Sequence, residues 1–211
     1  FNAYERDYQE WFVKRCFEAM NGVNPQDEPG HDSLPSAQVR NVHAEHRNVG
    51  LVIETRPDLV TSESLPWFRY LGVTKVQMGA QSLDDRILEL NQRGHTVQQT
   101  LEATALLRAG GFKVVLHWMP NLLGATPESD REDFARLWGQ DAYCPDELKI
   151  YPCQLLEHTK LFEIWQQGGY QPYSEATLLD LIADLKTTVP RYCRINRIIR
   201  DIPSTYVVAG N

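Results

Sequence analysis

Apolar residues recur along this chain in two patterns that alternate, one with the spacing of helices and one with the composition of buried strands. Apolar positions three and four apart predict helices, whereas short apolar runs bounded by Gly, Pro or Asn predict strands. The predicted helices are residues 4–20, 33–47, 62–71, 84–91, 97–109, 128–138 and 174–187. The predicted strands are residues 49–54, 75–79, 113–118, 147–151 and 194–200. In the first helix, Tyr8, Trp11, Phe12, Cys16 and Ala19 lie on or near one apolar stripe.

Strands that alternate with helices favour an α/β fold with a parallel sheet, because each helix returns the chain to the start of the next strand. The sequence contains neither GxGxxG nor GxxxxGK[ST]. These are the commonest phosphate-binding motifs of open doubly wound sheets, so their absence argues against that fold. A partial (β/α) barrel is therefore favoured over the open sheet, which also fits the element order. We expect one domain over residues 1–211, with a helical lead-in at 1–48 and strand and helix units at 49–203. The Gly- and Pro-containing residues 21–32 predict a loop.

The composition is that of an ordinary globular protein, with 42% apolar and 23% charged residues. No apolar run approaches the roughly 20 residues of a membrane span. The first residues lack the basic and apolar regions of a signal peptide, and the absence of an initial Met predicts a piece of a longer protein. We expect a cytoplasmic protein with no membrane partner.

Cysteine and histidine spacing does not predict a metal site within this chain. The four cysteines are Cys16, Cys144, Cys153 and Cys193. They match no zinc or cluster motif and no secreted disulfide framework, which favours a reduced, intracellular protein. His43 and His46 share a predicted helix face at a spacing that metal ligands use, but no carboxylate or cysteine partner is evident. We interpret them as surface histidines.

The formal charge of -7 argues weakly against a nucleic-acid partner, but the distribution of arginine changes this picture. Four arginines lie close together near the C-terminus: Arg191, Arg194, Arg197 and Arg200. Because a guanidinium suits phosphate recognition, this run is a candidate contact with a nucleic-acid backbone. The alternative is an arginine-rich edge paired with nearby Asp and Glu.

Polar side chains follow the predicted strands at the edge where the chemistry of barrel folds gathers. Glu54 ends its strand and can accept hydrogen bonds from an ammonium group, with Arg56 beside it to neutralise or orient it. Gln81 follows the next strand, and Arg93 follows the helix after that. An amide can fix ribose hydroxyls, and a guanidinium grips a carboxylate with two hydrogen bonds. This pair suits a ligand that contains both a nucleoside and an amino acid.

His117 and Tyr151 are further polar groups at the ends of apolar strands, and we regard both as tentative catalytic residues. Each candidate also has a structural interpretation. Glu54 and Arg56 fit a strand-end ion pair, His117 fits a satisfied core histidine, and Tyr151 fits a buried ring with its hydroxyl paired. Several polar strand ends that face one rim favour a ligand site over coincidence.

Motifs in six segments carry a resemblance to a known family. They are GLVIETRPD at 50–58, GAQS at 79–82, NQRGHT at 91–96, HWMPNL at 117–122, LKIYP at 148–152 and RDIP at 200–203. Together they resemble the radical S-adenosylmethionine (SAM) core of the Elongator catalytic subunit family, including its single-subunit bacterial and archaeal members. The resemblance spans residues 4–210 in order. It implies a partial TIM-like barrel of the radical SAM type with its N-terminal βα units missing.

The resemblance implies an enzyme that forms 5-carboxymethyluridine at the wobble uridine of tRNA. In that family a 4Fe–4S cluster cleaves SAM to a 5′-deoxyadenosyl radical, which takes hydrogen from the methyl group of acetyl-CoA, and the new carbon radical adds to C5 of uridine. By this resemblance Glu54 holds the SAM amino group, Gln81 contacts the ribose and Arg93 binds the carboxylate. The arginine run would contact the tRNA backbone, with strong salt dependence.

The resemblance also implies parts that lie outside this chain. The family's cluster cysteines precede a Gly-Gly-Thr strand end, and Phe1 resembles the residue that follows it, so we expect the cluster ligands elsewhere and an inactive fragment. The expected partners are tRNA, acetyl-CoA, an acetyltransferase domain of the same full-length protein, and a homo-oligomer or Elongator-like complex. Two alternatives remain: a non-catalytic tRNA-binding or scaffolding barrel, and another radical SAM methyl- or methylthiotransferase that acts on RNA.

Overall fold

The computed structural model describes residues 1–24, 26, 33–139 and 143–210, so most of the loop predicted at 21–32 lies outside the described residues. Its helices are α1 (Arg6–Met20), α2 (Leu34–Asn41), α3 (Ser64–Leu71), α4 (Asp85–Leu90), α5 (Val97–Ala109), α6 (Pro127–Ala135), α7 (Lys160–Gln166) and α8 (Glu175–Thr188). Its strands are β1 (Leu51–Thr55), β2 (Val73–Gln81), β3 (Lys113–Trp118), β4 (Glu147–Ile150), β5 (Leu155–Leu156), β6 (Arg194–Ile198) and β7 (Val207–Ala209). Short 3₁₀ turns occupy Pro57–Leu59, Arg136–Trp138 and Ser204–Tyr206.

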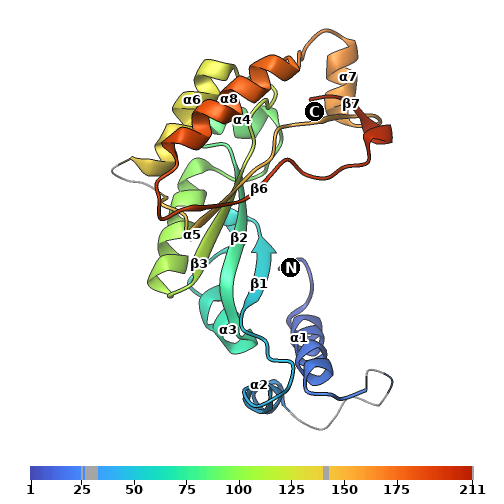
Figure 1. Cartoon of the computed structure of the whole chain (residues 1–211), viewed down its shortest axis with the longest axis vertical. Coiled ribbons are helices and arrows are strands. Elements are labelled where there is room, and N and C mark those ends of the chain that lie inside the picture. Colours follow the sequence, from blue (N-terminus) through green and yellow to red (C-terminus); the bar gives the residue numbers. More distant parts are fainter. Residues whose placement is uncertain (25, 27–32, 140–142, 211) are drawn as a thin grey trace.

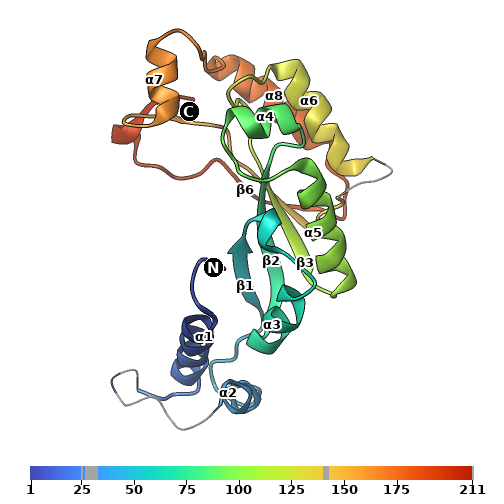
Figure 2. The ribbon, with the colours of Figure 1, turned by 180° about the vertical axis from the view of Figure 1, so that it is seen from behind.

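The main sheet is parallel and has the strand order β1-β2-β3-β4-β6. Helices α3 and α5 pack on β2 and β3, and α6 packs on α8. Figure 1 and Figure 2 show these helices on one side of the curved sheet. Because the crossover helices share one side, the sheet winds in one direction, as in a barrel, and leaves its concave face open. The predicted fold class, a partial (β/α) barrel, is confirmed.

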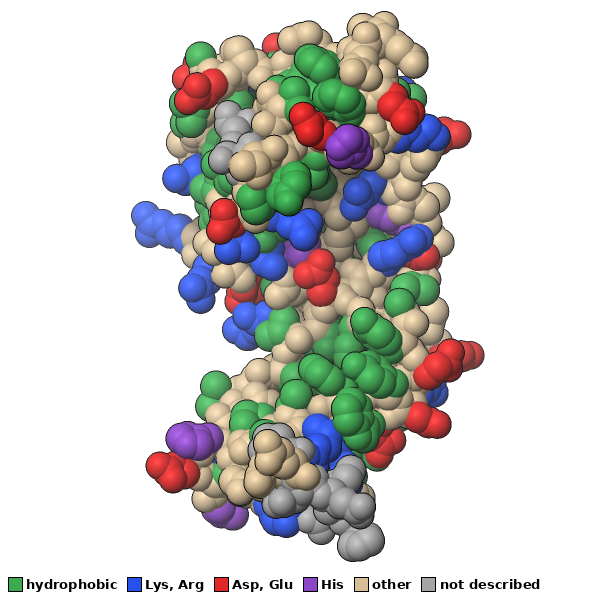
Figure 3. All heavy atoms as spheres, turned by 90° about the vertical axis from the view of Figure 1, so that its right-hand side faces the viewer, with side chains coloured by type: hydrophobic (Ala, Val, Ile, Leu, Met, Phe, Trp, Pro, Cys, Tyr) green, Lys and Arg blue, Asp and Glu red, His purple; other side chains and the backbone are tan. Residues whose placement is uncertain are grey.

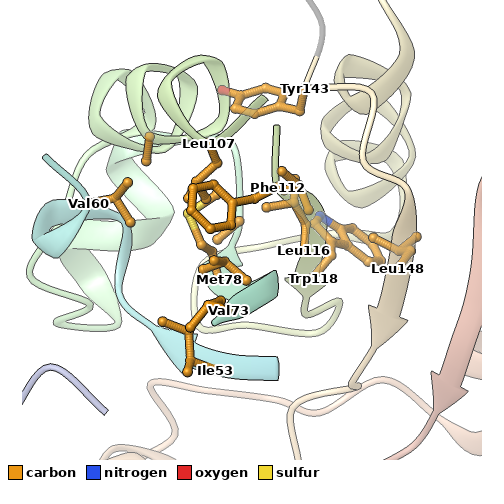
Figure 4. Packing of buried hydrophobic residues seen from close by; sticks show 14 of the residues in the cluster. Ile53, Val60, Val73, Met78, Leu107, Phe112, Leu116, Trp118, Tyr143 and Leu148 are labelled. Atoms are coloured by element: carbon orange, nitrogen blue, oxygen red, sulfur yellow. The ribbon is translucent and has the colours of Figure 1, made fainter. Parts of the chain in front are cut away.

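One hydrophobic core lies between the sheet and these helices. In β3 the alternate residues Val114, Leu116 and Trp118 belong to this core, whereas His117 faces the opposite, concave side. Figure 4 shows Leu116 and Trp118 packed with Met78, Leu107 and Leu148. Each fully buried side chain of this size contributes about 1.5–3 kcal/mol relative to exposure. The polar residues of the strands are therefore directed to the concave face.

The first helix forms as predicted but turns a different face to the core. Val13 and Phe17 are buried, whereas Tyr8, Trp11 and Phe12 are 45%, 48% and 47% exposed. The apolar stripe predicted for this helix is therefore wrong as a core-facing surface. Spacing alone did not distinguish two neighbouring apolar faces of one helix.

Helix α2 ends at Asn41, although the sequence predicted a helix to residue 47. The Asn41 side chain replaces the next helical turn, because its Nδ2 donates to the carbonyl of His46 at 3.1 Å and its Oδ1 accepts from the amide of Asn48 at 2.7 Å. His43 and His46 consequently lie beyond the helix and do not share a helix face.

Helix α7 and the two-stranded antiparallel sheet β5-β7 were not predicted. Strand β5 has only two residues, and its partner β7 lies about 50 residues later in the chain, so no local pattern marks the pair. In the described part of the chain, no helix is long and apolar enough to cross a membrane.

Candidate functional site

The carboxyl ends of the parallel strands meet at one edge and enclose a cavity of about 500 Å³. All five residues predicted at the rim line it: Glu54, Gln81, Arg93, His117 and Tyr151. A second cavity of about 460 Å³ adjoins the first and shares Glu54, Gln81 and Arg93 with it. The structure thus brings the sequence-predicted residues together, and the candidate cofactor residues line both cavities.

Gln81 has a left-handed backbone with a φ of 67°, which turns its side chain toward the cavity at the end of β2. Asp133 holds the following residues in place, since it accepts from the amide of Leu83 at 2.9 Å and from the Ser82 hydroxyl at 3.2 Å. Gly79 leaves room for the amide, because a Cβ at that position would lie 2.5 Å from Gln81 Nε2. A Gly two residues before Gln81 is therefore a steric requirement for this geometry.

Arg93 is half-buried and presents a guanidinium with unused hydrogen-bonding capacity. Its Nε atom is buried and has no hydrogen-bond partner among the described residues. Burial lowers the pKa of Arg93, and the neighbouring Arg56 acts in the same direction, whereas Cys153 opposes the shift. A buried donor without a partner costs about 1–3 kcal/mol. An anionic ligand in the cavity would remove this cost.

The sequence had suggested that Arg56 neutralises or orients Glu54. In the structure Arg56 does not pair with Glu54. Its guanidinium makes two hydrogen bonds of 2.9 Å to the carboxylate of Asp58 and donates to the carbonyl of Gly94 at 2.9 Å. Because Gly94 directly follows Arg93, this contact helps to hold the turn that positions the Arg93 side chain. Glu54 keeps its carboxylate exposed at the cavity, with its side chain 65% accessible.

His117 is a neutral imidazole with one satisfied nitrogen and one free acceptor. Burial, together with the positive charges of Lys149 and Arg200, lowers the pKa of His117 to about 4. Its Nε2 lies 2.9 Å from Gln77 Oε1, which also accepts from Lys149 Nζ at 2.5 Å. Since Gln77 Oε1 can only accept, the proton resides on Nε2. The other nitrogen, Nδ1, lies 3.8 Å from Glu54 Oε1 and offers a lone pair at the cavity.

Sequence reasoning missed Lys149, which lines the cavity, and Gln77, whose side chain bonds to both Lys149 and His117. Lys149 also lies 5.9 Å from the ring centre of Tyr151, and that ring meets His117 edge-on at 5.6 Å. The sequence did contain a signal for Gln77 and Lys149. Each is a polar residue within an otherwise apolar strand, and such residues face away from the core when they alternate with apolar ones. Below them, Glu147 pairs with Lys75 and accepts from Asn196.

The structure divides the arginine run. Arg197 and Arg200 line the cavity, whereas Arg191 and Arg194 do not. Because β4 and β6 are parallel and Arg194 pairs with Glu147 at the start of β4, Arg194 lies at the opposite end of the strand. Only the second half of the run therefore belongs to the cavity. On the face of the molecule shown in Figure 3, Lys and Arg side chains gather across the middle.

The cysteines and histidines do not form a metal centre in the part of the chain that the structure covers. All four cysteines are free, and no group of three or more His, Cys, Asp or Glu side chains there is arranged to hold a metal ion.

Family models identify the chain. The model of the radical SAM superfamily matches residues 20–137, and the model of the radical SAM C-terminal domain matches residues 145–211. The chain belongs to the radical SAM superfamily. Membership implies the use of a 4Fe–4S cluster and SAM.

Individual radical SAM proteins confirm the resemblance to the Elongator catalytic subunit. The chain is 43% identical to a tRNA uridine(34) acetyltransferase of Methanocaldococcus jannaschii and 35% identical to Elongator complex protein 3 of Saccharomyces cerevisiae, over its whole length. It spans only 38% and 37% of those proteins. A solved structure of an N-terminally truncated Elp3 from Methanocaldococcus infernus matches with a TM-score of 0.90 and 42% identity, covering 99% of this chain and 47% of that one.

The residues of the cavity fit SAM but not the cluster. The buried, unsatisfied Nε of Arg93 suits a carboxylate, the exposed carboxylate of Glu54 suits an ammonium group, and the amide of Gln81 suits ribose hydroxyls. A 4Fe–4S cluster requires thiolate ligands, and the described residues contain no such cysteine group.

Proposed function

We propose that this chain is the SAM-binding and substrate-positioning core of a radical SAM enzyme that forms 5-carboxymethyluridine at the wobble uridine of tRNA, with acetyl-CoA as co-substrate. The main support is the cavity at the strand ends, where Glu54, Gln81 and Arg93 converge. The names of the relatives, tRNA uridine(34) acetyltransferase and Elongator complex protein 3, support the choice of substrate. We propose that the full-length protein works in the cytoplasm, alone or in an Elongator-like complex.

Each side chain has a role that follows from its chemistry. Arg93 binds the SAM carboxylate, Glu54 accepts from the ammonium group and Gln81 contacts the ribose. When bound, SAM supplies the radical that initiates the reaction in this superfamily. His117 and Tyr151 lie beside these residues and position the substrate, with His117 Nδ1 as an acceptor. The arginine run, Arg191, Arg194, Arg197 and Arg200, contributes contacts to tRNA phosphates.

SAM affinity of the full-length protein tests the assignment of the cofactor residues. Arg93→Ala and Gln81→Ala should each weaken binding by about 10-fold or more, because a hydrogen bond to a charged group contributes about 1.5–3 kcal/mol. Arg131→Ala and Gln98→Ala are matched controls on the helical surface, where the wild-type side chains bond to Asp184 and Glu102. Equilibrium dialysis with unchanged affinity in both cavity variants would contradict the assignment.

Product analysis tests the reaction. We expect the full-length protein, purified without oxygen and given SAM, a reductant, acetyl-CoA and tRNA, to produce 5-carboxymethyluridine, detected by nucleoside mass spectrometry. A methylated or methylthiolated nucleoside would indicate the alternative transferase. A protein that binds tRNA but contains neither iron nor sulfide would indicate a scaffolding barrel.

A further inference from the structure

The cavity contains more positive charge than the proposed cofactor can balance. Four cations line it, namely Arg93, Lys149, Arg197 and Arg200, against the carboxylate of Glu54. SAM is itself a net cation, because its ammonium and sulfonium groups outnumber its carboxylate. If Arg93 and Glu54 bind the two ends of the amino acid, three positive charges remain beside a cationic ligand. A second, anionic ligand group is needed to neutralise them.

The three remaining cations form one wall of the cavity. Lys149 and Arg197 are register partners on the neighbouring parallel strands β4 and β6, so their Cα atoms lie side by side. Arg200 follows β6 and lines the same cavity. These residues lie opposite the β1 and β2 ends that provide Glu54 and Gln81, because β3 separates β2 from β4.

The backbone before Arg200 is strained in a way that positions this side chain. Ile199 has a φ of 68°, which is an uncommon and costly conformation for a β-branched residue. Its amide donates to the carbonyl of Ile150 at 2.9 Å, which ties the turn to the end of β4. The chain thus changes direction at Ile199 and leaves Arg200 at the rim of the cavity.

Among the described residues these cations lack carboxylate partners, unlike several other basic residues of the chain. Arg56, Lys75 and Arg131 form ion pairs with Asp58, Glu147 and Asp184. For Lys149, Arg197 and Arg200 the described residues provide no carboxylate within ion-pair distance. Three unpaired cations on one wall are the arrangement expected of an anion-binding surface.

We propose that Lys149, Arg197 and Arg200 form a phosphate subsite that binds an RNA backbone phosphate next to the nucleotide whose base enters the cavity. The burial of the lining residues changes from the inside of the cavity to its rim, which supports a polymeric ligand. His117 is buried and Lys149 is half-buried, whereas Arg197 and Arg200 are exposed. An inserted base would lie near His117 and Tyr151, and its flanking phosphate would remain at the exposed arginines. This inference rests on the proposed function.

A double-mutant cycle between protein and RNA tests the subsite. The full-length protein, without reductant, is titrated with an anticodon stem–loop that contains the wobble uridine, and with versions in which one phosphate beside that uridine is a neutral methylphosphonate. We expect one such replacement to weaken wild-type binding about 10-fold, as does Arg197→Gln or Arg200→Gln with the native RNA. With that modified RNA, the two variants should lose no further affinity.

Arg191→Gln and Arg194→Gln are the matched controls, since these arginines belong to the same run but lie outside the cavity. Their losses should add to that of the methylphosphonate. Additive losses for Arg197→Gln and Arg200→Gln would overturn the subsite, and so would lost acetyl-CoA affinity with unchanged RNA affinity. Normal formation of 5-carboxymethyluridine in wild type, together with additive cycles, would reject the subsite alone. A wild-type protein that neither binds nor modifies the stem–loop would reject the proposed function.

Discussion

At the scale of single residues, the cavity contains side chains that keep one hydrogen-bonding position free of a protein hydrogen bond. Arg93 keeps an unbonded Nε, and His117 has its Nε2 occupied by Gln77 while Nδ1 faces Glu54. The unpaired Nε of Arg93 is costly without a ligand, since buried polar atoms in proteins are normally paired. This cost makes Arg93 a candidate for binding rather than for packing, and His117 is a candidate because its Nδ1 faces the cavity.

Gly79 provides a test of the cavity that leaves its polar residues unchanged. In Gly79→Ala the new Cβ would lie 2.5 Å from Gln81 Nε2, so the flexible amide must move away from its position. We expect SAM affinity of the full-length protein to fall by about 10-fold, with a small change in melting temperature. In the control Gly139→Ala the nearest atom is 4.0 Å away. Equal SAM affinity in Gly79→Ala and wild type would show that the amide position is not critical.

At the scale of elements, buried carboxylates join the strand ends that form the rim. Asp133 of α6 accepts from Trp118 Nε1 of β3 at 2.8 Å and from the amide of Leu83 after β2. Asp130, one turn earlier, accepts from the amide of Asn121 at 2.9 Å and from the Tyr173 hydroxyl at 2.9 Å. Helix α6 therefore fixes the ends of two neighbouring strands from behind.

Asp133→Asn should weaken this link, because an amide oxygen cannot satisfy the three donors that the carboxylate satisfies. We expect a loss of about 1–3 kcal/mol in unfolding free energy and weaker SAM binding, through the displaced Gln81. The control Asp184→Asn removes an exposed pairing with Arg131 on the same side of the sheet and should change stability by less than about 0.5 kcal/mol. The same melting temperature in both variants would contradict the structural role of Asp133.

At the scale of the whole molecule, two buried groups give opposite contributions to stability between pH 4 and pH 6.5. The pKa of His117 falls from 6.5 to about 4 through burial, so its stabilising contribution is present above pH 6.5 and is lost as the pH falls. Burial raises the pKa of Asp130 from 3.8 to about 6, so its contribution is present below pH 3.8 and is lost as the pH rises. Each amounts to about 3 kcal/mol, and the two largely cancel.

Single substitutions should separate these contributions. Relative to wild type, His117→Gln should become more stable as the pH falls from 6.5 to 4, and Asp130→Asn should become less stable over the same range. Thermal unfolding of the full-length protein at several pH values measures both differences. His43→Gln, an exposed control, should follow the wild-type curve. Parallel curves for all four proteins would show that these buried groups do not titrate as described.

The sequence by itself determined the class of fold and most of the candidate cofactor site. Apolar strands separated by helices specify a parallel sheet, and polar residues directly after such strands must meet at one edge. Glu54, Gln81, His117 and Tyr151 were therefore predictable from local patterns, and the motifs around them indicated the family. The division of the chain into 1–48 and 49–203 stays a prediction.

Only the tertiary structure decided which partners these residues have. Arg56 turned to Asp58 and to Gly94, 38 residues away, and the direction of β6 placed Arg197 and Arg200 in the cavity but Arg194 at the opposite end. The position of Lys149 in the cavity depends on strand register, and the position of Asp133 behind the strand ends depends on the packing of α6. These contacts join residues far apart in the chain, and their energies depend on distances that no local pattern specifies.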